Sequence, residues 1–174
     1  MASIQNFFIK LFLKAVVDKK RQLGMPVKVT RNSLEKLSGM AKLPKGVIYE
    51  KVEFDGITAE WSIPANLKNP GVILYLHGGG YVAGSIRTHR GTTGRLAHAS
   101  KTKCLSVEYS LAPEKPFPAG IDDAIKAYHW LLKQGFDHKK IVIAGDSAGG
   151  GLSVATMLRL SDENAPQPAA GVLM

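Results

Sequence analysis

The sequence contains a pattern with a clear chemical meaning, Gly145-Asp146-Ser147-Ala148-Gly149, which matches the G-x-S-x-G of a nucleophile elbow. In an elbow, a sharp turn between a strand and a helix exposes the serine hydroxyl above a sheet. Small residues on both sides of the serine allow this bend. A serine hydroxyl attacks only when a base accepts its proton. The pattern predicts Ser147 as a catalytic nucleophile.

A glycine-rich segment, His77-Gly78-Gly79-Gly80, matches the pattern of an oxyanion hole. Attack on an ester carbonyl creates an oxyanion, and one preorganised donor stabilises it by roughly 3–4 kcal/mol. Glycines 78–80 allow bare backbone to approach the substrate, and the N–H of Ala148 is the expected partner donor. We expect His77 to hold this loop by hydrogen bonding and not to act as the base.

The same loop also fits a weaker dinucleotide fingerprint, G-x-G-x-x-A, over residues 78–83, with Glu108 as a possible ribose ligand. Gly84 and Ser85 separate the fingerprint from the next predicted helix. The acid expected about 20 residues further on would fall near residues 98–100, before Glu108. Nucleotide binding is therefore the less favoured interpretation.

The predicted nucleophile lacks a visible base. In this architecture the triad follows the order Ser, Asp or Glu, His, yet no histidine follows Ser147. Apart from His77, the histidines fall in or near predicted helices and loops, where we expect them on the surface: His89, His98, His129 and His138.

Composition indicates one domain, or part of one. The 174 residues are 45% hydrophobic, and the chain has a single cysteine and five histidines. No C-x-x-C or H-E-x-x-H spacing occurs, so we expect no metal site and no internal disulfide. We expect Cys104 to be a buried strand residue, and these features favour a reduced, cytoplasmic environment.

The net charge of +9 is concentrated at the N-terminus, where residues 1–50 hold ten Lys and Arg against three Asp and Glu. The basic stretches lack interleaved aromatic residues, so we expect a solvated cationic face and no nucleic-acid partner. Residues 4–17 are apolar but broken by two lysines, which argues against a signal peptide. Their three- and four-residue spacing predicts an amphipathic helix that needs a protein groove or, less favoured, a membrane surface.

The remaining pattern predicts an α/β protein with a mostly parallel sheet, an antiparallel N-terminal hairpin and helices on both faces. The hairpin turns at Asp55-Gly56, between strands 47–54 and 57–63. A short helix at 34–41, capped by Asn32 or Ser33, precedes it. Further strands are expected at 72–76, 102–107, 141–144 and 169–174. Further helices are expected at 88–99, at 121–134 and from Ser147 to about residue 160.

Three blocks, residues 77–85, 109–119 and 145–150, together resemble the hormone-sensitive-lipase-like α/β-hydrolases, which include the bacterial family IV esterases. The resemblance implies N-terminal cap helices at 1–46 and a partial catalytic domain at 47–174, ending before the last strands. It implies Ser147 as nucleophile and a carboxylesterase that cleaves small, short-chain acyl esters without a cofactor. The oxyanion donors and supporting residues that it implies are Gly79, Gly80 and Ala148, then His77, Gly78, Gly145, Asp146 and Gly149.

Two departures from the family pattern matter. Ser110 stands where the family usually has arginine, and the downstream blocks with the acid and histidine are missing. The chain is therefore predicted to be the N-terminal part of an esterase, inactive or very weak alone, completed by a C-terminal half or a homo-oligomer. The alternative is a non-catalytic protein that binds a small ligand on the same scaffold.

Overall fold

The hairpin predicted at Asp55-Gly56 forms one end of the sheet in the computed structural model, which describes residues 26–39 and 42–174. Strand β1 (Val47–Phe54) pairs antiparallel with β2 (Ile57–Pro64). Asp55 and Gly56 have φ angles of 48° and 75°, the left-handed pair that a two-residue hairpin turn requires. Strand β2 also pairs antiparallel with β4 (Lys103–Val107), which joins the hairpin to the rest of the sheet.

The other strands run parallel to one another. They are β3 (Val72–Leu76), β4 (Lys103–Val107), β5 (Ile141–Gly145) and β6 (Ala170–Leu173), and the sheet order is β1-β2-β4-β3-β5-β6. Strand β3 lies in the middle and pairs with both β4 and β5. Because Leu76 pairs with Gly145, the segments that follow β3 and β5 start side by side. The glycine loop and Ser147 therefore emerge at the same edge of the sheet.

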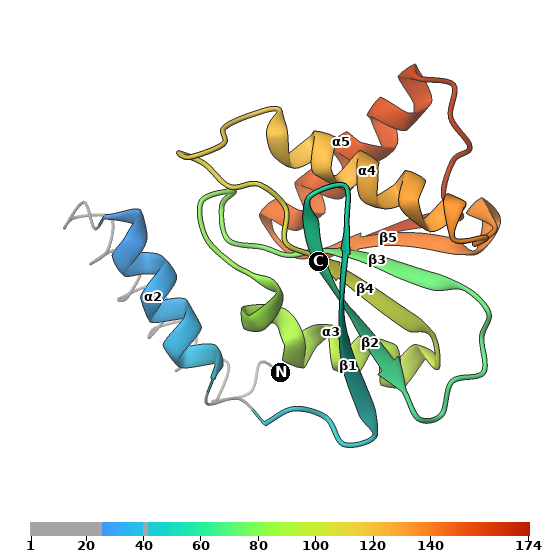
Figure 1. The fold of residues 1–174 in the computed structure, drawn as a ribbon, viewed down its shortest axis with the longest axis horizontal. Helices are drawn as coiled ribbons and strands as arrows, with labels where there is room; N and C mark the ends of the chain where they lie inside the picture. The colour runs from blue at the N-terminus through green and yellow to red at the C-terminus, as the bar shows by residue number, and fades with distance from the viewer. Residues whose placement is uncertain (1–25, 40–41) are drawn as a thin grey trace, which may run out of the picture.

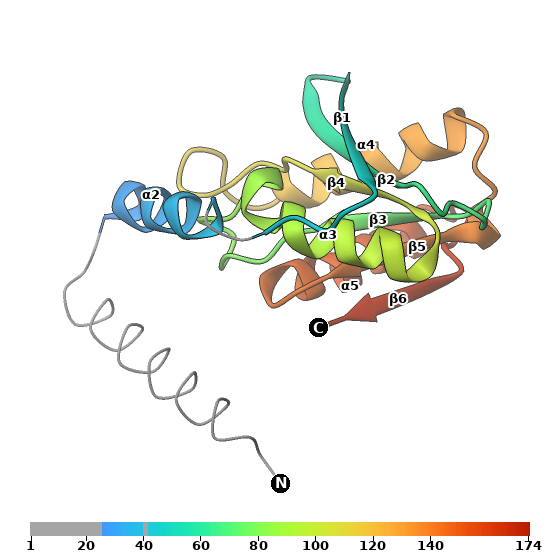
Figure 2. The same ribbon diagram turned by 90° about the horizontal axis from the view of Figure 1, so that it is seen from below.

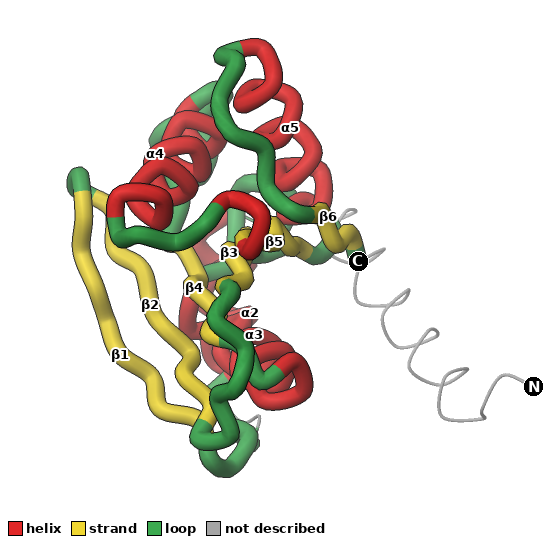
Figure 3. Tube along the Cα trace, turned by 90° about the vertical axis from the view of Figure 1, so that its right-hand side faces the viewer, coloured by secondary structure: helices red, strands yellow, loops and turns green. Residues whose placement is uncertain are grey.

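Helices cover both faces of the sheet, as Figures 1 and 3 show. Helix α3 (Ile86–Ser100) lies on one face with α2 (Val27–Ser38) beside it, and α4 (Ala119–Lys133) and α5 (Ala148–Asp162) lie on the other. Within residues 26–39 and 42–174, no helix is long and apolar enough to span a bilayer. The predicted fold, a mostly parallel sheet with an N-terminal hairpin and helices on both faces, is confirmed.

The core follows from strands that are apolar on both faces. Leu74, Leu76 and Ile143 pack under α4 and α5, whereas Tyr75 packs on the opposite face with Cys104, in a smaller cluster. Successive strand residues point to opposite faces, so a continuous apolar run serves both layers. Cys104 is fully buried, as predicted, and burial raises the pKa of its thiol.

The predicted start of the helix before the hairpin is wrong. Helix α2 begins at Val27, after Pro26, so Asn32 and Ser33 lie inside the helix and do not cap it. Ser33 donates instead to the Val29 carbonyl at 2.8 Å, a bond available to a serine within a helix. The helix predicted at residues 4–17 lies outside the described residues, and the domain boundary at residue 46 remains a prediction.

Strand β6 is the last strand of the sheet, next to β5 (Figure 2). All four of its residues are exposed, Val172 to 43% and Leu173 to 54%. The strand predicted at 169–174 thus forms an apolar edge, a surface of the kind that promotes strand pairing between molecules.

A buried and an exposed leucine on the helices should differ in how much stability is lost when each is replaced by alanine. Leu131 on α4 is fully buried, whereas Leu158 on α5 is 61% exposed. We expect Leu131→Ala to lower the free energy of unfolding by about 2–5 kcal/mol, because it removes buried methyl groups and leaves a cavity. Leu158→Ala should change it by less than about 0.5 kcal/mol. Urea unfolding of both variants measures this, and equal losses would contradict the assigned core.

Candidate active site

Ser147 occupies the turn between β5 and α5. Its φ of 51° and ψ of −118° lie outside the regions that a serine usually adopts. The residue is exposed, and its side chain does not cap the helix that begins at Ala148. Such a conformation costs of order 1–3 kcal/mol and persists only where the surroundings impose it. The hydroxyl is thus presented to solvent at the carboxyl edge of the sheet.

Gly149 explains how α5 can start so close to the sheet. A Cβ atom at this position would overlap the carbonyl oxygens of Leu76 and His77 at the end of β3. The Gly149 amide donates to the Asp146 carbonyl at 2.8 Å, which closes the first turn after the strand. The elbow therefore needs glycine here, because the helix packs directly on the strand that leads into the glycine loop.

The glycine loop turns tightly after β3. Gly79 and Gly80 have φ angles of 132° and 66°, which glycine adopts without strain. The Gly79 carbonyl accepts hydrogen bonds from Val82 at 3.3 Å and from Ala83 at 3.0 Å. Within residues 26–39 and 42–174, the amides of Gly79, Gly80 and Ala148 donate to no protein acceptor. Three main-chain donors thus remain available at the edge where Ser147 lies.

Asp146 joins the elbow to the glycine loop. Its Oδ1 accepts a hydrogen bond from the Tyr75 hydroxyl at 2.6 Å and another from the Gly78 amide at 2.9 Å. Burial raises the pKa of this carboxyl, but the Tyr75 hydrogen bond, the nearby His89 and the Gly78 amide outweigh that effect, so the pKa is lowered. The carboxylate is charged at neutral pH and links two segments that are distant in sequence.

His77 supports the glycine loop from the interior of the protein. Its side chain is fully buried, its Nδ1 donates to the Gly78 carbonyl at 3.0 Å, and its ring stacks on Tyr109 at 4.3 Å. The Tyr109 hydroxyl donates to the His77 carbonyl at 2.7 Å. Burial is the main cause that lowers the pKa of His77 to about 4, so the imidazole is neutral at pH 7. This geometry agrees with a loop-holding residue.

The expectation that His89 is a surface residue is wrong. Its side chain is only 18% exposed, and its Nε2 lies 3.5 Å from Asp146 Oδ1. Helix α3 begins at Ile86, so residue 89 lies in its first turn with its ring 5.4 Å from that of His77. The sequence did not fix which side of the helix would face the sheet. The other predicted surface histidines are half-buried or exposed: His98, His129 and His138.

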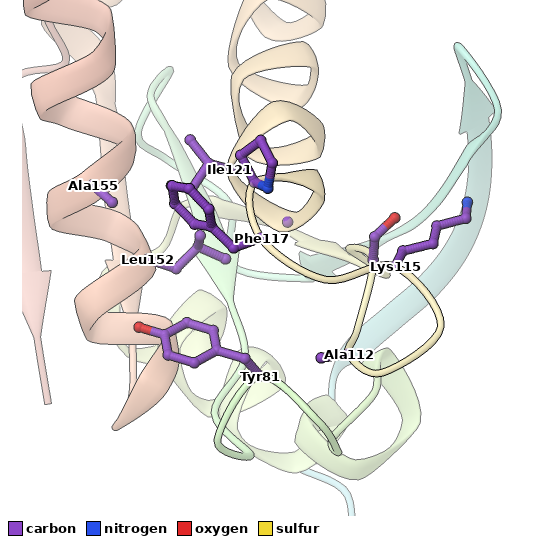
Figure 4. Close-up of a pocket in the computed structure, with 10 residues that line it drawn as sticks. Tyr81, Ala112, Lys115, Phe117, Ile121, Leu152 and Ala155 are labelled. Carbon is purple, nitrogen blue, oxygen red and sulfur yellow. The ribbon is translucent and has the colours of Figure 1, made fainter.

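A cavity of about 390 Å³ opens beside the glycine loop (Figure 4). Tyr81 forms one wall, Leu152 and Ala155 of α5 form another, and Phe117 and Ile121 complete its apolar lining. The other lining residues are Ser110, Ala112, Lys115, Pro118 and Gly120. Ser147 does not line the cavity, but Tyr81 and α5 connect the cavity to the loop and to the elbow.

Two residues singled out in the sequence have structural partners. Ser110, at the position where the family usually has arginine, donates to Asp123 through its amide at 2.9 Å and through its hydroxyl. Glu108, the possible ribose ligand of the less favoured interpretation, accepts the Ile86 amide at 2.9 Å, in the first turn of α3. In the part of the chain that the structure describes, no three His, Cys, Asp or Glu side chains gather as a metal site.

Sequence reasoning missed Tyr75 and Tyr109 as functional supports. Both stand in or next to apolar strand runs, where a tyrosine signals a buried hydroxyl that needs a partner. Their partners, Asp146 and the His77 carbonyl, are distant in sequence. Only the pairing of the strands brings them together.

Known proteins match this chain over most of its length. A family model described as alpha/beta hydrolase fold matches residues 73–174. An acetyl-hydrolase of Streptomyces hygroscopicus is 39% identical over 147 residues, which are 84% of this chain and 48% of the relative. An esterase of Acinetobacter venetianus is 33% identical over 97% of this chain and 55% of its own length. The chain spans about half the length of these curated relatives.

The fold comparison agrees. The crystal structure of an esterase from the bacterial hormone-sensitive lipase family superimposes with a TM-score of 0.83 and 42% sequence identity, over 86% of this chain and 50% of that one. Relatives and structure thus point to the family that the three sequence blocks indicated. The chain belongs to the α/β-hydrolase family, in its hormone-sensitive-lipase-like branch.

Proposed function

We propose that this chain carries the nucleophile and the oxyanion hole of a serine carboxylesterase. The observation that supports this most is the exposed Ser147, held at a positive φ at the same sheet edge as three amides that have no acceptor among the described residues. Such an edge is where catalytic loops gather in open α/β sheets. The names of the related esterases and of the acetyl-hydrolase agree with this chemistry.

In this proposal, Ser147 Oγ attacks the ester carbonyl and passes its proton to a base. The carbonyl oxygen becomes an oxyanion, which accepts hydrogen bonds from the amides of Gly79, Gly80 and Ala148. Collapse of the intermediate breaks the ester C–O bond, and the base returns the proton to the leaving alcohol. A water molecule then releases the acid from Ser147 by the same steps.

No residue of this chain is assigned as the base. Of the five histidines, His77 is buried and neutral, and His89 faces Asp146 from the α3 side of the sheet. We propose that the base and its acid come from polypeptide outside these 174 residues, either further sequence or another subunit. An isolated oxyanion hole with substrate binding still gives roughly 10³–10⁴-fold catalysis over water in well-studied serine enzymes. The chain alone should therefore be a very weak esterase.

The substrate is proposed to be a small acyl ester. The 390 Å³ cavity next to Tyr81 is lined mainly by apolar side chains, so it suits a short hydrocarbon group better than a charged one. The ester link is uncharged and needs only the main-chain donors of the loop. No cofactor has a step in this chemistry.

A non-catalytic ligand-binding protein is the second candidate. The observation that favours it is a serine elbow without a base, next to a preformed apolar cavity. Such a protein would bind a small apolar ligand and would not react with it. The reactivity of Ser147 distinguishes the two candidates.

We expect an alkyl fluorophosphonate to phosphonylate Ser147 slowly, because the reagent uses the same amide donors as the tetrahedral intermediate while the proposed base lies outside these residues. Intact-mass and peptide mass spectrometry measure the adduct. Ser147→Ala should abolish it, whereas Ser161→Ala, at an exposed serine of α5, should leave it unchanged. No adduct on the folded wild-type chain, even after prolonged incubation, would favour the ligand-binding candidate.

We expect Asp146→Asn to weaken both fold and site. The neutral amide replaces charge-assisted bonds from Tyr75 and Gly78, which are about twice as strong as neutral ones. The free energy of unfolding should fall by about 1–3 kcal/mol, and the labelling rate by roughly tenfold. Asp162→Asn, at an exposed carboxylate of α5, is the matched control. Equal effects of the two variants would contradict the assigned role.

The difference in stability between the wild type and Asp146→Asn should depend on pH in a definite direction. The pKa of Asp146 is lowered in the folded chain, so its stabilisation is full above the unfolded pKa of about 3.9 and is lost as the pH falls through the folded pKa. Urea unfolding from pH 3 to pH 7 should show wild type and Asp146→Asn converging only at the acid end. Curves that converge toward neutral pH would refute this.

A further inference from the structure

Helix α2 attaches to the molecule through a polar face. Its half-buried residues recur at spacings of three and four, and none of its residues is fully buried. The residues of this face are Val27, Thr30, Arg31, Leu34, Glu35 and Ser38. In Figures 1 and 2, the loops that follow β3 and β4 extend toward this helix. Specific polar contacts, more than buried apolar area, hold α2 in place.

Arg31 makes four of these contacts. Its Nε donates to the Val82 carbonyl at 2.7 Å, and one terminal nitrogen donates to the Ala112 carbonyl at 2.9 Å. The two terminal nitrogens bind both carboxylate oxygens of Glu114 at 2.8 Å. Val82 belongs to the glycine loop, and Ala112 lines the cavity. One guanidinium thus joins α2 to the glycine loop and to a residue that lines the cavity.

Glu35, one helical turn further, holds the other end of the loop. Its carboxylate accepts the hydroxyl of Ser85, the residue that caps α3, and pairs with Arg87 at 3.2 Å. Arg31 and Glu35 lie at i and i+4, so they share one side of α2. Together they bind the segment 82–87 at its beginning and its end.

We propose that Arg31 is a positioning residue that fixes the glycine loop through the Val82 and Ala112 carbonyls. This inference rests on the proposed function, because it assigns the loop amides a role in catalysis. The loops are also joined directly, since the Ala112 amide donates to the Tyr81 carbonyl at 2.9 Å. Arg31 closes a ring of contacts around Tyr81, next to the predicted donor Gly80.

The exposed fractions indicate which of the four contacts matters. The side chains of Arg31 and Glu114 are 29% and 61% exposed, and an ion pair that is this open to solvent contributes little. The two main-chain carbonyls lie on the partly buried side. The planar fork of arginine reaches both carbonyls and the carboxylate at once, which the single ammonium of lysine cannot do. Arginine should therefore not be replaceable by lysine.

Amide hydrogen exchange of the full chain tests the proposal without any requirement for activity. The amides of Val82, Ala83 and Ala112 are hydrogen-bonded within the loops, so their exchange reports loop opening. We expect Arg31→Gln and Arg31→Lys to raise their exchange rates by roughly tenfold, the loss of about one hydrogen bond. Glu114→Gln should raise them less. Lys28→Gln, an exposed charge on α2, should leave them unchanged.

Fluorophosphonate labelling of the same variants links the loop to reactivity. The labelling rate should fall in Arg31→Gln and Arg31→Lys and stay unchanged in Lys28→Gln, with melting temperatures measured to confirm that each variant is folded. Exchange rates in the folded Arg31 variants equal to those of wild type would overturn the proposal. Faster exchange with unchanged labelling would also overturn it, because the loop would then not position the donors.

The two proposals fail in different ways. A wild-type chain that is never labelled refutes the proposed function, and the assigned role in catalysis fails with it, whatever the exchange rates. If the wild-type chain is labelled and the Arg31 variants have unchanged exchange and labelling rates, only the positioning role of Arg31 is refuted.

Discussion

The carboxylate of Asp146 lies at the point on which the candidate site depends. It follows β5, yet it accepts hydrogen bonds from Tyr75 within β3 and from Gly78 just after β3. Parallel pairing places Leu76 beside Gly145, so one side chain can cross from the elbow to the loop. The neighbouring His89 and the stacked rings of His77 and Tyr109 form a largely buried layer of polar and aromatic side chains beneath the glycine loop. His89 supports the loop from α3, whereas Tyr109 belongs to the core cluster under α4 and α5.

Local sequence patterns were sufficient for the elements but not for their contacts. The Asp55-Gly56 turn and the apolar runs predicted the strands, because turn geometry and double-sided burial depend on neighbouring residues. Helix α2 was predicted too short because a capping pattern at Asn32 was taken as its start, whereas the structure uses Glu35 to bind Ser85. His89 was misplaced for a similar reason, since the side of α3 that faces the sheet depends on tertiary packing.

The tight turns at Ser147 and in the glycine loop could be predicted, because the small residues around Ser147 and the left-handed φ of Gly79 and Gly80 are local requirements. The supports could not be predicted. Arg31 is one of many basic residues in a positively charged N-terminal segment, and nothing in the sequence distinguishes it from Lys28. Its identity comes from two carbonyl oxygens supplied by loops some 50 and 80 residues further along the chain. Long-range main-chain acceptors leave no local signature.

The strained φ of Ser147 persists because three neighbours impose it together. Gly149 sets α5 against the carbonyls that end β3, Asp146 binds the glycine loop, and the Ser147 amide donates to the Met174 carbonyl at 2.8 Å. The Met174 amide in turn donates to the Gly145 carbonyl at 3.0 Å, so the residue that follows β6 is hydrogen-bonded on both sides of Asp146. The exposed apolar strand β6 is thus both the last strand of the sheet and, through the next residue, a support of the turn at Ser147. Any polypeptide that pairs with this edge would stabilise the elbow through β6, without touching Ser147 itself.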